Sequence, residues 1–536
     1  MTNAAVDWRE RARTGPVHFL GLGGAGVSGA ARVLAARGVR VSGHDRAPSD
    51  LLRALLADLP EIAATVGASN AADLPGEACL VVRSAAVPDD DPQVVAALAG
   101  GVPVVKYAEL LGELPGAGRG LAVAGTHGKT TTSWLLWHAL MGLAREAGGE
   151  LPGCLIGGLL TATADGPVAR ALTARGEPTT LNARAADADG WFVVEACEYD
   201  RSFLHLAPHG AIVTNVEADH LDYYGTLAAI EEAFGAFVAG VEAPGAAAEH
   251  GPGNAPSTRR DAGLVVLGPD VPASVEAAAA GAVWRLGREL VVEDLGVGRG
   301  GRRFRLAGPG WRTPEVELAV PGGYNVTNAA LALGLAIGLA VEAGADPQAA
   351  AAAAARGVAA FGGSARRFET WGHLGAGEGR APVRVVHDYA HHPTELEVLL
   401  RGAHETFPDH ELHVLFQPHQ ASRTARLFED FVAVFAAAPI ARLVVAPVYG
   451  ARRHIDGANT AGALALAARV ADAGKVAVSP ETLDASVAAL RGGLDPERPA
   501  LALVVGAGDV EETRAAMLEP LEFGSASQAA GQEVSA

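Results

Sequence analysis

The residues with the clearest chemistry form the segment GTHGKTTT at positions 125–132. It follows the apolar run Leu121–Ala124 and precedes an apolar helical pattern, which is the strand–loop–helix order of a phosphate-binding loop. Backbone N–H groups and the Lys129 ammonium can hold the β- and γ-phosphates of a nucleotide, and the Thr130 hydroxyl can reach its magnesium ion. Position 123, where the full pattern has its first glycine, is valine. The segment predicts an ATP site made of Gly125, Thr126, His127, Gly128, Lys129, Thr130 and Thr131.

A second glycine-rich segment, GLGGAG at positions 21–26, follows the apolar run Val17–Leu20 and opens another helical pattern. Glycines at such a turn let the backbone approach a diphosphate, and the helix N-terminus supplies N–H donors. Asp45 stands about 20 residues further on, where a carboxylate can accept a bond from a ribose hydroxyl. A tight turn that binds nothing is the plain alternative. The segment predicts a nucleotide-diphosphate site at Gly21, Gly23, Gly24, Gly26 and Asp45.

Acidic and imidazole side chains follow two more predicted strands. VEACEYD occupies positions 194–200, and TNVEADHLD occupies positions 214–222. Ligands of open α/β sheets bind at the carboxyl ends of strands, so Glu195 and His220 are predicted to join Thr130 as ligands of the nucleotide's metal ion. Glu217 and Asp222 are interpreted as acids that merely solvate a loop.

The C-terminal third repeats this pattern with cationic and imidazole groups. HDYAHHP, QPHQASRT, VYGARRH and GAGD each follow a predicted strand, and a tandem Arg366-Arg367 precedes them. The HxxxHH spacing gives no third ligand or nearby cysteine, so a transition-metal site is disfavoured. Imidazole and guanidinium groups at strand ends favour recognition of phosphates and carboxylates instead.

These groups need a scaffold of parallel sheets. Short β-like runs alternate with Ala/Leu-rich helical runs along most of the chain, which is typical of parallel α/β architecture. The segments 112–120 and 357–364 are predicted linkers, and 161–189 and 243–261 are predicted insertion loops. The expected organisation is a Rossmann-like domain at 1–117, an ATP-binding domain at 118–360, a second Rossmann-like domain at 361–523 and a disordered tail at 524–536.

Composition limits the partners. The 536 residues carry a formal net charge of −19, which disfavours nucleic acid and anionic membrane surfaces as partners. Three widely spaced cysteines form no disulfide or metal pattern, which favours a reducing cytoplasm. The longest apolar stretch, Ala329–Val341, has thirteen residues and is too short to span a bilayer. A soluble cytoplasmic protein, monomeric or weakly dimeric, is expected.

Taken in order, these motifs resemble the series found in the Mur ligases, from Val17 to about Asp509. PGGYNVTNAALAL and FGGSARRFE complete the series. The resemblance implies three domains, which bind a UDP-linked sugar, ATP and an amino acid respectively. GTHGKT and the glycine-rich opening are similar to both the alanine-adding and the tripeptide-recycling branches. The short run from Ser202 to Pro208, followed by NVEADHLDYYG, is similar to the alanine-adding branch. That branch implies UDP-N-acetylmuramate and L-alanine as substrates and ATP with Mg²⁺ as cofactors.

The family's reaction implies roles for individual residues. The sugar carboxylate attacks the γ-phosphate, and the amino group of L-alanine then displaces phosphate from the acyl phosphate. Lys129, His220 and His391 would be the catalytic residues. Asn325, Arg366 and Asp388 would add to the ATP site. The UDP-linked substrate would contact the glycine-rich segment with Asp45, and also Ser28, Ser84, His127, Tyr389 and Arg423.

Four departures from the family pattern affect these expectations. Gly323-Tyr324 stand where Arg-His is common, His387 stands where an aspartate is common, and Gln420 replaces an expected arginine. No lysine lies between Lys129 and Lys475, so a carbamylated lysine cannot bridge two metal ions here. The Gln420 change removes one cationic partner from the substrate end of the predicted site.

Three other functions compete with this one. A recycling ligase that joins a tripeptide to the same UDP-sugar uses the same chemistry and differs in its second substrate. An NAD-dependent oxidoreductase or sensor would explain the first glycine-rich segment but not GTHGKTTT. A GTPase-like switch lacks the guanine-reading Asn-Lys-x-Asp motif.

Overall fold

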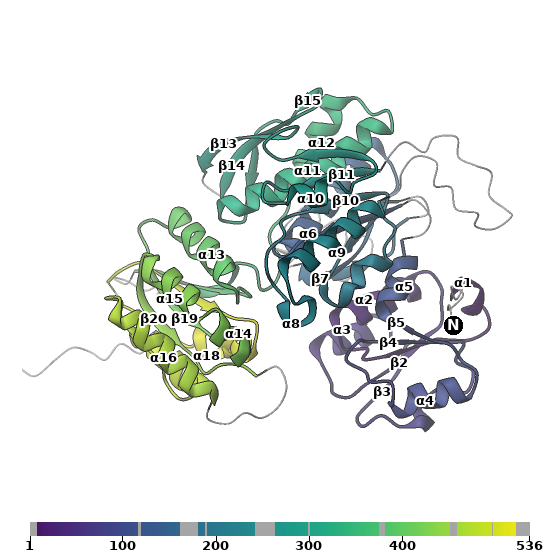
Figure 1. Cartoon of the computed structure of the whole chain (residues 1–536), viewed down its shortest axis with the longest axis horizontal. Helices are drawn as coiled ribbons and strands as arrows, with labels where there is room; N and C mark the ends of the chain where they lie inside the picture. Colours follow the sequence, from purple (N-terminus) through teal and green to yellow (C-terminus); the bar gives the residue numbers. More distant parts are fainter. Residues whose placement is uncertain are drawn as a thin grey trace, which may run out of the picture. The chain divides into compact units, whose positions relative to one another are not determined.

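A computed structural model describes residues 8–115, 119–160, 181–187, 190–241, 263–298, 301–374, 381–450, 458–495 and 497–520. The predicted insertion 243–261 and the tail 524–536 lie outside these residues. The described chain forms two compact units, one of residues 1–320 and 325–364 and the other of residues 321–324 and 365–536. Figure 1 shows the elements in the colours of the sequence.

The first sheet is entirely parallel, in the order β3-β2-β1-β4-β5. Alternate residues of its central strand point to opposite faces, so Phe19 packs under α2 and α3 while Leu20 packs under α4. This strand order places a topological switch point between β1 and β4, where ligands of such sheets bind. The elements are β1 (Val17–Leu20), α2 (Ala25–Ala36), β2 (Val41–Asp45), α3 (Asp50–Asp58), β3 (Ala63–Val66), β4 (Leu80–Arg83), α4 (Pro92–Ala99), β5 (Val104–Lys106) and α5 (Tyr107–Glu113).

The central sheet has seven strands in the order β12-β11-β10-β6-β9-β7-β8, with β8 antiparallel to β7. Leu121 and Val123 of β6 face the core under α6, and Ala122 and Ala124 face the core under α9. Its strands are β6 (Gly120–Ala124), β7 (Gly153–Leu160), β8 (Leu181–Arg184), β9 (Phe192–Glu195), β10 (Gly210–Val213), β11 (Leu264–Leu267) and β12 (Ala282–Arg285). Its helical elements are α6 (Lys129–Ala147), η2 (Tyr199–His205), α8 (Leu221–Tyr224), α9 (Leu227–Ala239) and α10 (Ala273–Glu276).

Two long helices complete this core. α12 (Pro347–Ala359) packs closely on α6. The two helices are so near each other that a Cβ atom built on Gly142 would lie only 2.3 Å from the backbone oxygen of Ala353. α11 (Gly323–Glu342) is apolar and long enough to cross a membrane, but 78% of its apolar window is buried within the protein, as in the core helix of a soluble fold. The apolar stretch expected to be thirteen residues long is therefore part of a 20-residue helix.

A small antiparallel sheet was not predicted. It consists of β13 (Val291–Val297), β14 (Arg302–Gly308), β15 (Trp311–Arg312) and β16 (Val316–Leu318). Phe304, Leu306 and Leu318 of this sheet join the core formed by α6, α11 and α12. The exposed face carries arginine and acidic side chains in ion pairs, such as Arg305 with Glu293 at 3.6 Å.

The second unit holds a six-stranded sheet in the order β17-β18-β22-β19-β20-β21, in which only β17 is antiparallel to its neighbour. α13, α15 and α16 share one core with it, and α17 and α18 share the other. The strands are β17 (Glu369–Leu374), β18 (Val383–Asp388), β19 (Glu411–Phe416), β20 (Ile440–Val445), β21 (Ala477–Val478) and β22 (Ala500–Val505). The helices are α13 (Pro393–Thr406), α14 (Ala421–Arg426), α15 (Phe428–Ala437), α16 (Ala458–Asp472), α17 (Leu483–Arg491) and α18 (Arg514–Leu518).

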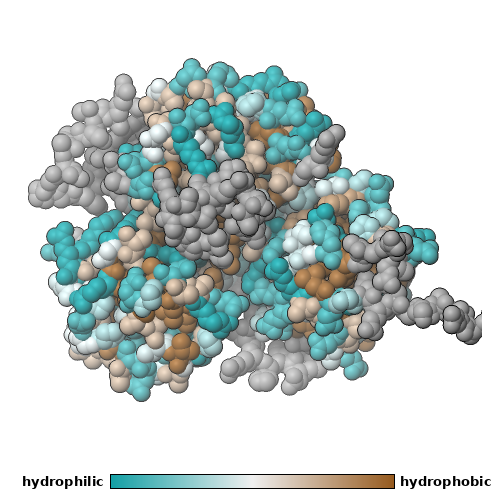
Figure 2. All heavy atoms as spheres, turned by 180° about the vertical axis from the view of Figure 1, so that it is seen from behind, coloured by the Kyte–Doolittle hydropathy of each residue, from teal (hydrophilic) through white to brown (hydrophobic). Residues whose placement is uncertain are grey.

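The prediction of parallel α/β architecture is confirmed, and two local expectations are wrong. Residues 181–184, assigned to an insertion loop, form the edge strand β8, because Ala183 is fully buried against the neighbouring strand and α2. Gly112 and Glu113, assigned to a linker, complete α5. The surface in Figure 2 is mainly hydrophilic, with hydrophobic residues in small patches, as on most soluble proteins.

Candidate functional site

The loop after β6, at the centre of the seven-stranded sheet, has the backbone of a phosphate-binding loop. Gly125 and Gly128 adopt φ angles of 137° and 81°, which side chains with a Cβ atom rarely tolerate. Gly128 caps α6 at its N-terminus, so the first helical N–H groups and the Lys129 side chain border the same loop. The loop therefore combines unpaired N–H donors, a helix dipole and an ammonium group around one point.

The Lys129 ammonium is held by several acceptors. Nζ donates to the backbone oxygens of Gly125 at 2.6 Å and Thr126 at 3.0 Å, and pairs with Glu198 Oε2 at 2.8 Å. Because the Glu198 side chain is only 4% exposed, water screens this pair little, and each charge neutralises the other. Burial alone would lower the pKa of Lys129, but Glu198, together with Cys197 and Glu195, outweighs it and raises this pKa above its usual value. Lys129 is therefore a fixed cation at neutral pH.

The Thr130 hydroxyl and the Glu195 carboxylate meet beside this ammonium. Thr130 Oγ1 donates to Glu195 Oε1 at 2.9 Å, and the N–H of Gly157 donates to Glu195 Oε2 at 2.8 Å. Thr130 is the second residue of α6, which follows β6, and Glu195 ends β9. The parallel register of β6 and β9 brings the two residues together. A hydroxyl and a carboxylate are hard oxygen ligands, which is the donor chemistry that Mg²⁺ prefers. These two residues fit the predicted metal site.

The strand on the other side, β10, braces the loop. The side-chain oxygen of Asn215 accepts the N–H of His127 at 2.8 Å, and the Thr214 hydroxyl donates to the His127 carbonyl at 2.6 Å. The backbone N–H of Glu217 donates to the Thr126 hydroxyl at 2.9 Å. The segment after β10 thus fixes the loop through its backbone groups as well as through side chains.

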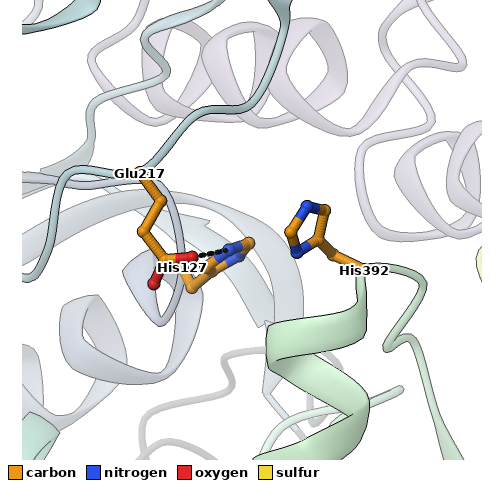
Figure 3. A group of neighbouring side chains, drawn as sticks. All are labelled: His127, Glu217 and His392. Carbon is orange, nitrogen blue, oxygen red and sulfur yellow. Dashed lines mark ion pairs between the residues drawn. The ribbon is translucent and has the colours of Figure 1, made fainter. Parts of the chain in front are cut away.

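Glu217 does more than solvate a loop, which corrects that expectation. Its Oε2 lies 3.5 Å from Nε2 of His127, and Figure 3 shows the imidazole and the carboxylate facing each other. His392, also drawn there, caps α13 in the second unit. The side chain of Asp222 lies outside the described residues.

His220 occupies a strained position after β10. Its φ angle is 51°, and its Nε2 lies 3.9 Å from Glu198 Oε1 and 3.9 Å from Asp219 Oδ2. The ring also packs edge-on against Tyr199, with 5.1 Å between centroids. Its described ionic neighbours are therefore Glu198 and Asp219, and its role as a metal ligand beside Thr130 and Glu195 stays a prediction.

Two asparagines on α11 line the other side of the loop. Asn325 is 4% exposed and accepts a bond from the Asn328 amide at 3.2 Å. A Cβ atom on Gly128 would lie 2.9 Å from Asn328 Oδ1, so the amide rests directly on the turn that starts α6. The structure brings the predicted Asn325 close to the loop through Asn328, which the prediction did not include.

The glycine-rich segment 21–26 turns at the switch point of the first sheet. Gly21 has φ 82° and packs against Ser84, since a Cβ atom there would lie 2.9 Å from Cβ of Ser84. Asp45 Oδ2 accepts the N–H of Gly23 at 2.7 Å. Ser28 is buried and donates to the carbonyl of Ala25 at 3.1 Å. The predicted residues therefore cluster, with Asp45 holding the loop itself, while their contact with a UDP group stays a prediction.

In the second unit, Asp388 ends β18 in a fully enclosed position. Its two oxygens accept the N–H groups of Phe368 and Ala390, each at 2.8 Å. Burial raises the pKa of Asp388 to about 6. Nδ1 of the preceding His387 donates to the Val504 carbonyl at 2.8 Å, and burial lowers the pKa of this imidazole to about 4. Because a backbone carbonyl only accepts, Nδ1 of His387 carries the proton.

Cationic and aromatic groups surround the next residues. The guanidinium carbons of Arg366 and Arg367 lie 5.8 Å and 5.1 Å from the Tyr389 ring centre. The Arg366 side chain also bonds Glu511 at 2.5 Å. Cation–π contacts of this kind leave part of each guanidinium available to an anion.

His391 follows the end of β18 and His419 follows the end of β19, and their ring centroids lie 5.8 Å apart. Burial lowers the pKa of His391, and burial together with His391 and Arg423 lowers the pKa of His419 to about 4. Both rings are therefore neutral at pH 7. Tyr449 stacks on His419 with 5.6 Å between centroids, and Arg423 is 8% exposed. The strand ends of this unit thus combine neutral imidazoles with a buried guanidinium, which suits an amino acid.

The structure brings the predicted residues into separate groups. The ATP loop, Glu195, His220 and Asn325 belong to the first unit, as does the glycine-rich segment; Arg366, Asp388, Tyr389, His391 and Arg423 belong to the second. The prediction missed Glu198, Asn215 and Asn328, although all three stand inside the motifs it used. Their positions could have indicated them. Glu198 and Asn215 follow the ends of strands, and Asn328 lies one helical turn from the predicted Asn325.

Three family models match consecutive parts of the sequence. They are the Mur ligase family catalytic domain at residues 16–118, the Mur ligase middle domain at 123–336 and the Mur ligase glutamate ligase domain at 366–518. A UDP-N-acetylmuramate–L-alanine ligase from Kineococcus radiotolerans is 41% identical over 519 residues, covering 95% of this chain and 96% of its own length. The enzyme of the same name from Salinibacter ruber is 36% identical over 512 residues, covering 94% and 95%.

Solved structures share the fold. The UDP-N-acetylmuramate–alanine ligase of Thermotoga maritima gives a TM-score of 0.68 at 24% identity and covers 94% of this chain and 98% of its own. A murein peptide ligase from Psychrobacter arcticus gives a TM-score of 0.60 at 22% identity, covering 95% and 99%. Both likenesses concern the arrangement of the elements in three domains.

Proposed function

Because the chain belongs to the Mur ligase family, we propose that it joins L-alanine to the carboxylate of UDP-N-acetylmuramate at the expense of ATP, a step in peptidoglycan precursor synthesis. The main support is the near-complete match to relatives that carry this activity in their names, at 36–41% identity. The preset loop around Lys129 supports the ATP-dependent part independently, because its donors and charges suit a triphosphate.

We assign the phosphoryl-transfer step to the loop of the first unit. The substrate carboxylate attacks the γ-phosphorus, the bond to the β,γ-bridging oxygen breaks, and ADP leaves with the electron pair. Lys129 and the N–H groups at the start of α6 stabilise charge on the transferring phosphoryl oxygens. Thr130 and Glu195 would hold a Mg²⁺ ion, which supplies Lewis-acid stabilisation of the same oxygens when bound.

We assign recognition of L-alanine to the strand ends of the second unit. The amine must be neutral to attack the acyl phosphate, and His391, whose pKa burial lowers, is a neutral imidazole able to accept its proton. Arg423 supplies a guanidinium for the amino-acid carboxylate. Displacement of inorganic phosphate from the resulting tetrahedral adduct forms the amide. The cytoplasm, where ATP and the UDP-sugar occur, is the proposed location.

The test is phosphate release from ATP and Mg²⁺ with UDP-N-acetylmuramate, in the presence and absence of L-alanine. We expect release that needs both the UDP-sugar and L-alanine and that EDTA abolishes. Release with the tripeptide L-alanyl-γ-D-glutamyl-meso-diaminopimelate in place of L-alanine would assign the chain to peptide recycling. No release with either acceptor would refute ligation.

A further inference from the structure

Tyr107 packs on the glycine-rich segment of the first unit and has no assigned role. It directly follows β5, whose last residue, Lys106, is in register with Arg83 at the end of β4. This register places Tyr107 at the switch-point edge of the first sheet, one strand beyond Ser84. Tyr107 is also the first residue of α5, which leads from the first sheet towards the central one.

The phenol packs on the glycine-rich segment. A Cβ atom built on Gly26 would lie 2.7 Å from both Cζ and the hydroxyl of Tyr107. Gly26 is the second residue of α2, so the hydroxyl lies beside the helix N-terminus that we propose for the diphosphate. The absence of a side chain at position 26 is what leaves room for the phenol.

The phenol of Tyr107 is also within electrostatic reach of Glu195. Burial first, and then the charges of Glu195 and Cys197, raise the pKa of Tyr107 above its usual value. The hydroxyl therefore keeps its proton at neutral pH and acts as a donor. Among the described residues it has no hydrogen-bonding partner, so this donor is free for a ligand.

Contacts between the first and central sheets fix this arrangement. The Asn182 amide on β8 donates to the Ala25 carbonyl at 2.7 Å, which attaches the first turn of α2 to the central sheet. A Cβ atom on Gly112 of α5 would lie 2.2 Å from the His205 carbonyl at the end of η2. The first turn of α2 and the helix α5, which both border Tyr107, are thus attached to the central part of this unit by direct contacts.

A UDP-linked acid must extend from the glycine-rich segment to the phosphoryl group at Thr130 and Glu195. Tyr107 contacts the first of these and interacts electrostatically with Glu195 of the second. We propose that the Tyr107 hydroxyl donates a hydrogen bond to the sugar-acid end of the UDP-linked substrate. The inference rests on the proposed function and adds a substrate-binding residue to it. It places recognition of the acid on a residue that touches the glycine-rich segment instead of on the ATP loop.

The experiment compares Tyr107→Phe with wild type by calorimetry in the absence of ATP. The phenyl ring keeps the packing on Gly26 and removes only the donor. We expect the Kd of UDP-N-acetylmuramate to rise about tenfold, as expected for one lost hydrogen bond to a charged group, with an unchanged Kd for UDP. In turnover, KM for the UDP-sugar should rise while KM for ATP stays within about twofold.

Tyr223→Phe is the matched control, because it removes a hydroxyl from a tyrosine that is 41% exposed and has no assigned role. It should bind UDP-N-acetylmuramate as wild type does. Equal affinity of wild type and Tyr107→Phe for the UDP-sugar would overturn the inference, and so would an equal loss for UDP, UDP-sugar and ATP. If wild type binds no UDP-sugar at all, the proposed function itself fails.

Discussion

Charged side chains are paired with one another around the ATP loop of the first unit, whereas burial keeps imidazoles uncharged at the strand ends of the second. Around the loop, ions are matched before any ligand binds, as in the Lys129–Glu198 pair at 2.8 Å. In the second unit, burial suppresses ionisation and keeps the rings of His387 and His419 neutral. Both groups of residues follow parallel strands, so topology sets their position and local burial sets their charge. Chemistry in the first unit should therefore depend on single charges, and that in the second on pH.

The largest expected effect comes from Lys129→Ala. Loss of the ammonium should lower kcat by on the order of 10³-fold or more, because the charge acts directly on the transferring phosphoryl group. Binding of UDP-N-acetylmuramate should be nearly unchanged, since the glycine-rich segment lies on another sheet. Phosphate release measures the first quantity and calorimetry the second. An equal loss of sugar binding would refute the separation of the two nucleotide sites.

A second variant separates charge from folding in this experiment. Lys129→Ala alone leaves the buried Glu198 carboxylate without its cation, at a cost of about 3 kcal/mol in the free energy of unfolding. Lys129→Ala combined with Glu198→Gln should recover most of that stability and none of the turnover. Recovery of turnover by the double variant would show that Lys129 serves only to neutralise Glu198.

The sequence was sufficient for the parallel scaffold and for the loops that follow it. The strand Val17–Leu20 has the bounds of the apolar run that predicted it, because buried parallel strands are short apolar runs ended by polar or glycine residues. Glycines at 125 and 128 marked a turn that needs positive φ. These signals are local, which is why one chain segment is enough to find them.

Residues whose role depends on another segment were harder to predict. Glu198 becomes the partner of Lys129 only because η2 follows β9 next to β6. Asn328 is one helical turn from Asn325 and rests on Gly128, a residue 200 positions earlier in the chain. The sheet β13–β16 was missed because its strands are half-exposed and charged, without the apolar runs that marked the buried strands.

An effect of intermediate size is expected for two adjacent residues, His387 and Asp388, whose contributions to the free energy of unfolding should depend on pH in opposite directions. His387, with its pKa lowered to about 4, contributes stability that is present above pH 6.5 and is lost as the pH falls towards 4. Asp388, with its pKa raised to about 6, contributes stability that is present below its usual pKa and is lost as the pH rises through 6. Each difference corresponds to about 3 kcal/mol.

Urea titrations between pH 4 and pH 7 check these signs. Relative to wild type, Asp388→Asn should gain unfolding free energy as the pH rises, and His387→Gln should lose it. Parallel changes in the two variants would show that burial does not control both groups.

The smallest effect is expected at the edge of the ATP loop. Glu217→Gln removes the carboxylate that lies 3.5 Å from His127, but the Glu217 side chain is 34% exposed, so water screens the pair. The backbone bond from residue 217 to the Thr126 hydroxyl remains. KM for ATP should rise about threefold or less, with kcat nearly unchanged. Thr126→Val removes that backbone bond's acceptor and should raise KM for ATP further. A loss in Glu217→Gln as large as that in Lys129→Ala would mean that the exposed pair, and not the buried one, organises the loop.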